Sequence, residues 1–235
     1  MNRFFVENTD EISGEDAHHI KNVLRLKEGD GIICIKNKKE FLCNIDKFEK
    51  NSIILRVGEA LGTKISEEKP EITLMQGLPK GDKLEFIIEK AVETGVYEVI
   101  PLKLSRSISK VSDKDVEKKL IRWGKISKSA AQQSNGLFIP RVTEPKTIKQ
   151  LDFSKYDLKI ICYEDEKKTR LKDILKKHKS PKSIAIIIGP EGGISKEEIE
   201  FLTKNGFSPA SLGERILRTE TAGIYGMASI NYHYS

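Results

Sequence analysis

The 235-residue sequence predicts an α/β chain, with a small and mostly antiparallel β-barrel over residues 1–69 and a mostly parallel sheet between helices over residues 70–235. Three observations support this division. Early strand-like runs follow one another across short turns, later ones alternate with helical segments, and a polar stretch at 62–69 that ends at Pro70 reads as a linker. The hydrophobic content of 38% is enough to bury a core, which excludes a wholly disordered protein.

The N-terminal segment combines several strand-like runs with one short helix. Ser13 is a candidate N-cap with an acidic residue, Asp16, at the third helical position, and the apolar residues that follow fall on one helical face. The strand-like runs are residues 3–6, 31–36, 40–49 and 52–57. One short helix with strands closing on each other favours a small barrel.

From residue 70 strand-like and helical segments alternate, which favours a parallel sheet covered by helices. Residues 183–189, SIAIIIG, are continuously apolar, as in a strand that is buried on both faces. Ser195, with Glu198 three residues later, forms a capping box that opens a helix. We expect the last strand to end at Leu212-Gly213. The other expected strands are 72–78, 97–102 and 158–164, and the expected helices lie near 82–94, 113–133 and 219–232, with a lysine-rich helix after 164.

Charge and cysteine content narrow the class of protein. The net charge of +6 permits a polyanionic partner without requiring one. No apolar run reaches the about 18 residues of a membrane span, and the N-terminus is not a signal peptide. Cys34, Cys43 and Cys162 form no CxxC pair, and the histidines form no HExxH pattern. We therefore expect a cytoplasmic protein with no metal site and no membrane partner.

The first candidate site is the loop Gly189–Gly193, between the buried strand and the capped helix. Ligands of open α/β sheets bind at the carboxyl ends of strands, and glycines let a ligand approach the backbone. Glu191 would repel a phosphate, and neither GxxxxGK[ST] nor GxGxxG is present, so a cationic or zwitterionic ligand fits better. The alternative is a tight turn that merely needs glycine.

The second candidate site runs from residue 211 to residue 222. Thr219 or Thr221 can cap the final helix. Arg218 and Glu220 lie within one helical turn of a second expected strand end, where an arginine beside a carboxylate can orient a planar substrate and move a proton. The alternative is a capping sequence with surface charge pairs.

Together these stretches resemble the 16S ribosomal RNA (uracil-N3)-methyltransferases of the SPOUT class, over almost the whole chain. The most specific motifs are IGPEGGIS (188–195) and LGERILRTETA (212–222). Further matching segments are RFF (3–5), HHIKNVLRLKEGD (18–30), QGLPKGDKLEFIIEKAVETGV (76–96), SRS (105–107) and WGKISKSAAQQS (123–134). Where the family has Gln-Ser-Gly-Arg, this chain reads Gln133-Ser134-Asn135-Gly136, so one basic contact is missing.

The resemblance implies a PUA-like RNA-binding barrel at 1–69 and a trefoil-knotted SPOUT-type methyltransferase domain at 70–235. It also implies a homodimer, for which the helix bearing Ile224, Met227 and Ile230 is a candidate interface, with core packing as the alternative. The implied reaction is the S-adenosylmethionine-dependent methylation of N3 of a uridine in 16S rRNA of the small ribosomal subunit. A non-catalytic RNA-binding or ribosome-assembly factor with a degenerate cofactor pocket is the competing hypothesis, and the two intact motifs favour the enzyme.

On this resemblance we expect S-adenosylmethionine to bind between the two motif loops. The expected cofactor-binding residues are Ile188, Gly189, Glu191, Gly192, Gly193, Leu212, Gly213, Ile216, Leu217, Thr221 and Ala222. Arg218 is expected to stabilise the uracil anion. Glu220 is expected to accept the N3 proton, directly or through water, and is otherwise a first-turn helix carboxylate. The expected RNA contacts are Arg3, Arg25, Lys27 and Arg106.

Overall fold

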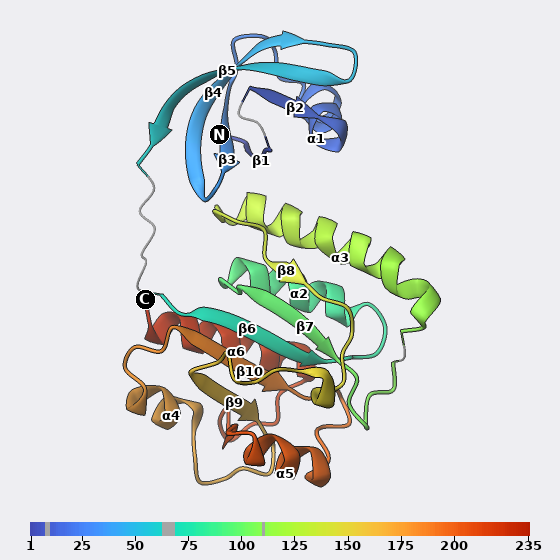
Figure 1. The fold of residues 1–235 in the computed structure, drawn as a ribbon, viewed down its shortest axis with the longest axis vertical. Helices are drawn as coiled ribbons and strands as arrows, with labels where there is room; N and C mark the ends of the chain where they lie inside the picture. The colour runs from blue at the N-terminus through green and yellow to red at the C-terminus, as the bar shows by residue number, and fades with distance from the viewer. Residues whose placement is uncertain (8–9, 63–68, 110) are drawn as a thin grey trace. The chain divides into compact units, whose positions relative to one another are not determined.

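A computed structural model describes residues 1–7, 10–62, 69–109 and 111–235 (Figure 1). The chain forms two compact units, one of residues 1–65 with 131–139 and the other of residues 66–130 with 140–235. The expected linker at 62–69 falls almost wholly on residues outside the described ranges. No helix in the described part of the chain is long and apolar enough to cross a membrane.

The first unit is built on a five-stranded sheet with the strand order β1-β3-β4-β5-β2. Its strands are β1 (Arg3–Phe5), β2 (Glu11–Ser13), β3 (Gly31–Lys36), β4 (Lys39–Phe48) and β5 (Ser52–Leu61). Only β1 and β3 pair in parallel, and the other neighbours are antiparallel. The helix α1 (Gly14–His18) continues into a π-helical turn, η1 (His19–Val23), whose Ile20 is fully buried in the core of this unit.

The described strands form a curled and mostly antiparallel half-barrel, which agrees with the small β-barrel predicted for residues 1–69. The strand order runs from β1 to β2, so these two strands are the edges of the described sheet. The strand β2 was not predicted, because three residues are too few to show an alternation. Ser13 occupies the N-cap of α1, but its side chain makes no capping hydrogen bond.

The second unit contains a six-stranded sheet with the order β11-β9-β10-β6-β7-β8, in which every pair is parallel. Its strands are β6 (Glu71–Gly77), β7 (Glu98–Leu102), β8 (Arg141–Val142), β9 (Leu158–Cys162), β10 (Ser183–Ile188) and β11 (Ser208–Ala210). Its helices are α2 (Lys83–Glu93), α3 (Asp113–Gln133), η2 (Ile148–Gln150), α4 (Leu171–Lys177), α5 (Lys196–Lys204) and α6 (Thr219–His233), and the residues of α3 from Ala131 onward are counted with the first unit. The predicted parallel α/β architecture is therefore confirmed.

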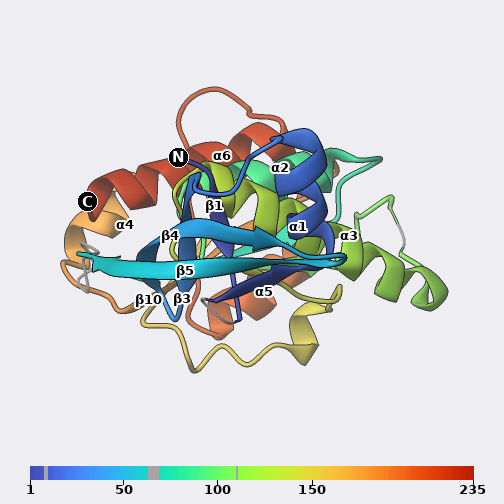
Figure 2. The same ribbon diagram turned by 90° about the horizontal axis from the view of Figure 1, so that it is seen from above.

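The central strand β10 packs against helices on both faces. Alternate side chains point to opposite faces of a strand, so Ala185 and Ile187 join the core cluster that includes Leu202 of α5. On the other face Ile186 touches α6, where a Cβ at Gly226 would lie 2.7 Å from the Cδ1 of Ile186. Figure 2 shows α2 and α6 on one side and α5 on the other. Burial on both faces explains the continuous apolar run.

The structure corrects the predicted end of the last strand and the predicted interface on the last helix, and it confirms the capping box of α5. The last strand, β11, ends at Ala210, so Leu212-Gly213 do not end it and lie instead in the loop that follows. Met227 and Ile230 are fully buried in this unit, which excludes them as interface residues and supports core packing. The capping box of α5 is confirmed, with the backbone N–H of Glu198 donating to Ser195 Oγ at 3.2 Å and the N–H of Ser195 donating to Glu198 Oε2 at 3.0 Å.

The loop after β10 crosses the end of β6 so closely that only glycine fits at position 77. A Cβ there would lie 2.6 Å from both the N and the Cδ of Pro190. We expect Gly77→Ala to lower the free energy of unfolding by about 1–3 kcal/mol, because the added methyl group overpacks this contact. The matched control is Gly124→Ala in α3, where a Cβ meets nothing within 4 Å. It should raise stability by about 0.5–1 kcal/mol in urea unfolding, and a similar loss in both variants would contradict the assignment.

Candidate functional site

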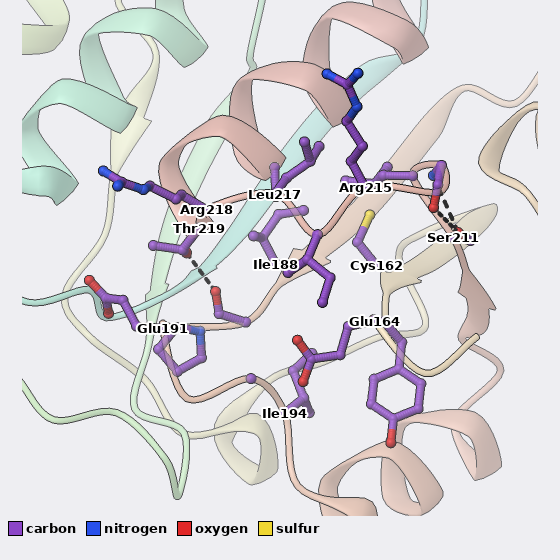
Figure 3. Close-up of a pocket in the computed structure, with 18 of the residues that line it drawn as sticks. Cys162, Glu164, Ile188, Glu191, Ile194, Ser211, Arg215, Leu217, Arg218 and Thr219 are labelled. Carbon is purple, nitrogen blue, oxygen red and sulfur yellow. Dashed lines mark hydrogen bonds between the residues drawn. The ribbon is translucent and has the colours of Figure 1, made fainter. Parts of the chain in front are cut away.

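A cavity of about 390 Å³ opens at the carboxyl edge of the parallel sheet. It is lined by the segments that follow β9, β10 and β11, together with Lys83 at the start of α2. The volume lies within the range of about 300–1,000 Å³ that is typical of small-molecule sites. Parallel strands carry their carboxyl ends at one edge, so loops that are far apart in the sequence meet here (Figure 3).

Most residues predicted to hold a cofactor line this cavity. These are Ile188, Gly189, Glu191, Gly193, Leu212, Gly213, Ile216, Leu217 and Ala222. Gly192 and Thr221 are not among the lining residues, and both are exposed. The structure thus brings the two motif loops together around one cavity.

The loop Gly189–Gly193 is held by short contacts to other segments. Gly193 has a φ of +71°, and a Cβ there would lie 2.8 Å from Glu164 Oε1, so both conformation and space favour glycine. A Cβ at Gly192 would lie 3.0 Å from the carbonyl oxygen of Arg106. The guanidinium of Arg106 donates to the carbonyl oxygen of Gly192 at 3.2 Å. The predicted RNA contact Arg106 is therefore engaged, in this structure, in supporting the loop.

The start of α6 differs from the prediction. Arg218 occupies the N-cap, and no side chain caps the helix there, so neither Thr219 nor Thr221 is the cap. Thr219 is buried, and its hydroxyl donates instead to the carbonyl oxygen of Gly189 at 2.6 Å. The Thr219 hydroxyl, which sequence rules predict to cap the helix, therefore bonds the distant Gly189 instead.

Three charged side chains form a cluster beside the cavity. The ammonium of Lys83 lies 3.0 Å from Glu191 Oε1 and forms an ion pair with Glu220 Oε2 at 3.3 Å. The backbone N–H of Lys80 also donates to the Glu191 carboxylate, at 3.2 Å. Burial opposes ionisation of Glu191, but hydrogen bonds from its own backbone N–H, from Lys83 and from Lys80 outweigh it and hold its pKa below the usual range. The hydrogen bond to Glu191 is likewise the main cause that raises the pKa of Lys83.

The two predicted catalytic residues occupy different positions. Arg218 lines the cavity, and its guanidinium makes no hydrogen bond or ion pair with the residues that the structure describes. Glu220 is not among the lining residues, and its carboxylate is engaged with Lys83. In Figure 3 the side chains of Arg218 and Arg215 both extend outward from the centre of the cavity, Arg218 on the side where Glu191 lies and Arg215 on a different side.

Sequence reasoning missed the contribution of the segment after β9. Cys162 lines the cavity, and burial raises the pKa of its thiol to about 12, so it acts as a neutral apolar wall. Glu164 directs its carboxylate toward the middle of the cavity (Figure 3). The expected strand 158–164 had placed Glu164 inside the sheet, but β9 ends at Cys162. The rule that ligands bind at strand ends would have identified this segment.

The remaining predicted RNA contacts lie in the first unit. Arg3 forms an ion pair with Glu40 of β4, and only 10% of its side chain is exposed, which leaves little of it for an RNA phosphate. Arg25 and Lys27 are exposed, and the backbone of Arg25 has a φ of +53°. Both side chains lie on the surface of the first unit, where an RNA phosphate could reach them.

Comparison with known proteins gives matches over nearly the whole chain. Residues 66–231 match the family model described as RNA methyltransferase domain, and residues 12–58 match the RNA methyltransferase PUA domain. Ribosomal RNA small subunit methyltransferase E of Bacillus subtilis is 38% identical over 99% of this chain and 96% of that protein.

Two solved structures are similar in fold and sequence. A methyltransferase of Legionella pneumophila with bound SAM has a TM-score of 0.87 and 31% identity, covering 99% of this chain and 97% of that one. A ribosomal RNA small subunit methyltransferase E of Neisseria gonorrhoeae bound to S-adenosyl methionine has a TM-score of 0.85 and 28% identity, with the same coverage.

The charge cluster gives a test in solution. Glu191 has a lowered pKa, so its carboxylate stabilises the fold above its unfolded-state pKa, and this contribution is lost as the pH falls through the folded-state value. We expect Lys83→Met to raise the pKa of Glu191 toward the usual range, as measured by NMR titration of the carboxyl carbon. Lys80→Met is the control, because Lys80 bonds Glu191 through its backbone N–H and should leave that pKa unchanged. Equal shifts in both variants would refute the role of the Lys83 ammonium.

Proposed function

This chain belongs to the ribosomal RNA small subunit methyltransferase E family, and on that premise we propose that it methylates N3 of a uridine in 16S rRNA, using S-adenosylmethionine as methyl donor. The observation that carries the proposal is the cavity at the carboxyl edge of the sheet, lined by both motif loops. Relatives with the same architecture have been solved with S-adenosylmethionine bound. A small-subunit rRNA substrate is consistent with action in the cytoplasm.

The residues of the cavity fit S-adenosylmethionine. Ile188, Ile194 and Leu217 provide apolar walls for an adenine ring, and the glycines of the loop leave backbone N–H and C=O groups within reach of a ligand. The carboxylate of Glu164 suits the positive charge of a sulfonium or an ammonium group. The neutral thiol of Cys162 competes with neither interaction.

The reaction requires little covalent chemistry from the protein. S-adenosylmethionine supplies an electrophilic methyl group; the N3–C bond forms as the S–C bond breaks, and the N3 proton leaves the uracil. We propose that Arg218 stabilises the negative charge that spreads onto uracil O2 and O4, because a fixed guanidinium acts most strongly where water is excluded. Glu220 lies outside the lining of the cavity and beside Lys83, so in this proposal it accepts the proton through a water molecule.

The proposal assigns RNA binding mainly to the PUA-like domain at 1–69. The exposed Arg25 and Lys27 are its phosphate contacts, which release counterions on binding. The methyltransferase domain at 70–235 is the trefoil-knotted part in this proposal, and Arg106 acts there first on the cofactor loop.

We also propose a homodimer, on the basis of the family. Because Met227 and Ile230 are buried in the core, an interface on α6 has to use its exposed side chains. Tyr225 of α6 is 50% exposed and Phe86 of the adjacent α2 is 47% exposed, and both are apolar enough to be buried in a contact between copies.

Arg218→Ala tests the function directly. With small subunits that lack the methyl group, single-turnover transfer at saturating S-adenosylmethionine should fall about 10²–10³-fold, because one electrostatic donor is lost. The affinity for the cofactor should stay within a few-fold. The control is Arg215→Ala in the same loop, which also lines the cavity but extends toward a different side of it from Arg218 in Figure 3, so its transfer rate should stay close to normal.

Mass spectrometry of the rRNA distinguishes the outcomes. If the unaltered protein binds the small subunit and forms no N3-methyluridine, the competing hypothesis of a non-catalytic assembly factor replaces the enzyme. If Arg218→Ala keeps the normal rate while the unaltered protein is active, the anion-stabilising role belongs to another residue.

A further inference from the structure

A buried chain of hydrogen bonds joins the two loops of the cavity to the central sheet. Gln76 Nε2, at the end of β6, donates to Thr219 Oγ1 at 2.9 Å, and Thr219 Oγ1 donates to the carbonyl oxygen of Gly189 at 2.6 Å. Gln76 is fully buried and Thr219 is 6% exposed. The chain therefore connects a strand, the start of α6 and the loop after β10, and it runs from the fully buried Gln76 to the half-buried Gly189 at the cavity.

The direction of each hydrogen bond is fixed by its surroundings. Gln76 Nε2 also lies 3.0 Å from the carbonyl oxygen of Gly77, which can only accept, so the amide group must face this side. The single hydroxyl proton of Thr219 is then directed to Gly189, because its oxygen already accepts from Gln76. Only a residue with a hydroxyl group can accept and donate at this point.

The opposite side of the Gln76 amide is closely packed. Its Oε1 is buried and has no hydrogen-bond partner among the residues that the structure describes. A Cβ at Gly223 would lie 3.1 Å from that oxygen, so a glycine in α6 leaves the room that the amide occupies. The amide thus gains its hydrogen bonds from the cavity side alone, which makes Thr219 its essential long-range partner.

We propose that Thr219, held by Gln76, is a positioning residue for the cofactor: it fixes the Gly189 carbonyl and thereby sets the separation of the two loops between which S-adenosylmethionine binds. This inference rests on the proposed function. Loss of the hydroxyl leaves Gln76 Nε2 with the Gly77 carbonyl alone and removes the Thr219 hydrogen bond to the Gly189 carbonyl, so the loop relaxes away from the geometry that fits the cofactor. Thr219 also lines the cavity, but its proposed action runs through the Gly189 carbonyl, so the effect falls on cofactor affinity and leaves the rate at saturating cofactor unchanged.

The experiment compares two substitutions that differ only in the hydroxyl group. Thr219→Val keeps the shape of the side chain, and we expect it to weaken S-adenosylmethionine binding about tenfold or more in calorimetry. Thr219→Ser keeps the hydroxyl and should bind within about threefold of the unaltered protein. At saturating cofactor the single-turnover rate of both variants should stay within about threefold, which separates positioning from catalysis.

A second buried threonine supplies the control for loss of stability. Thr143 is 5% exposed, its hydroxyl donates to the carbonyl oxygen of Glu144 at 3.0 Å, and it does not line the cavity. Thr143→Val should lower the melting temperature and leave cofactor affinity unchanged. If Thr219→Val does not fold, Gln76→Met removes the other end of the chain and should weaken binding in the same direction.

Three results would overturn the positioning role. The first is an unchanged affinity of Thr219→Val for S-adenosylmethionine. The others are a loss of that affinity in Thr219→Ser, or in Thr143→Val, as large as the loss in Thr219→Val. Failure of the unaltered protein to bind S-adenosylmethionine would instead overturn the proposed function, and the positioning role with it.

Discussion

The parallel pairing of β10 with β6 and β9 is the constraint on which the site depends. Its register places Ile188 opposite Gln76 on one side and opposite Cys162 on the other, so these three residues reach the carboxyl edge of the sheet together. The loops that follow these strands therefore meet at that edge. The cavity, its apolar floor and the hydrogen bonds between its loops all follow from this alignment.

The loop after β10 is anchored at three of its residues by contacts from three other segments of the chain. The Gly189 carbonyl accepts from Thr219, the Glu191 carboxylate is held by Lys83 and the Lys80 N–H, and the Gly192 carbonyl accepts from Arg106. A loop with few side chains would otherwise sample many conformations. Anchoring it in advance lets a ligand bind without a large ordering cost, which is how a glycine-rich loop can be both accessible and rigid.

The sequence predicted the elements whose signal is local and long enough. The predictions of β10 and of the Ser195–Glu198 capping box were correct. Burial on both faces requires a continuous apolar run, and the capping box requires two residue types three positions apart, so both can be read from the local sequence. The strands β2 and β8 were missed because two or three residues show no period, and the end of β11 was placed too late for the same reason. Thr219 was misread as a cap because its partner Gln76 lies 143 residues away, and no local rule can indicate such a contact. Glu164 was missed for a different reason, because the expected strand was two residues too long and placed it inside the sheet and not after the end of β9.

Hydrogen–deuterium exchange with and without S-adenosylmethionine reports where the cofactor binds without any substitution. We expect slower exchange on cofactor addition in segments 162–167, 188–194 and 211–222, which line the cavity, and unchanged exchange in residues 10–62 of the first unit. Protection that is confined to the first unit, or unchanged exchange at 188–194 under saturating cofactor, would contradict this expectation.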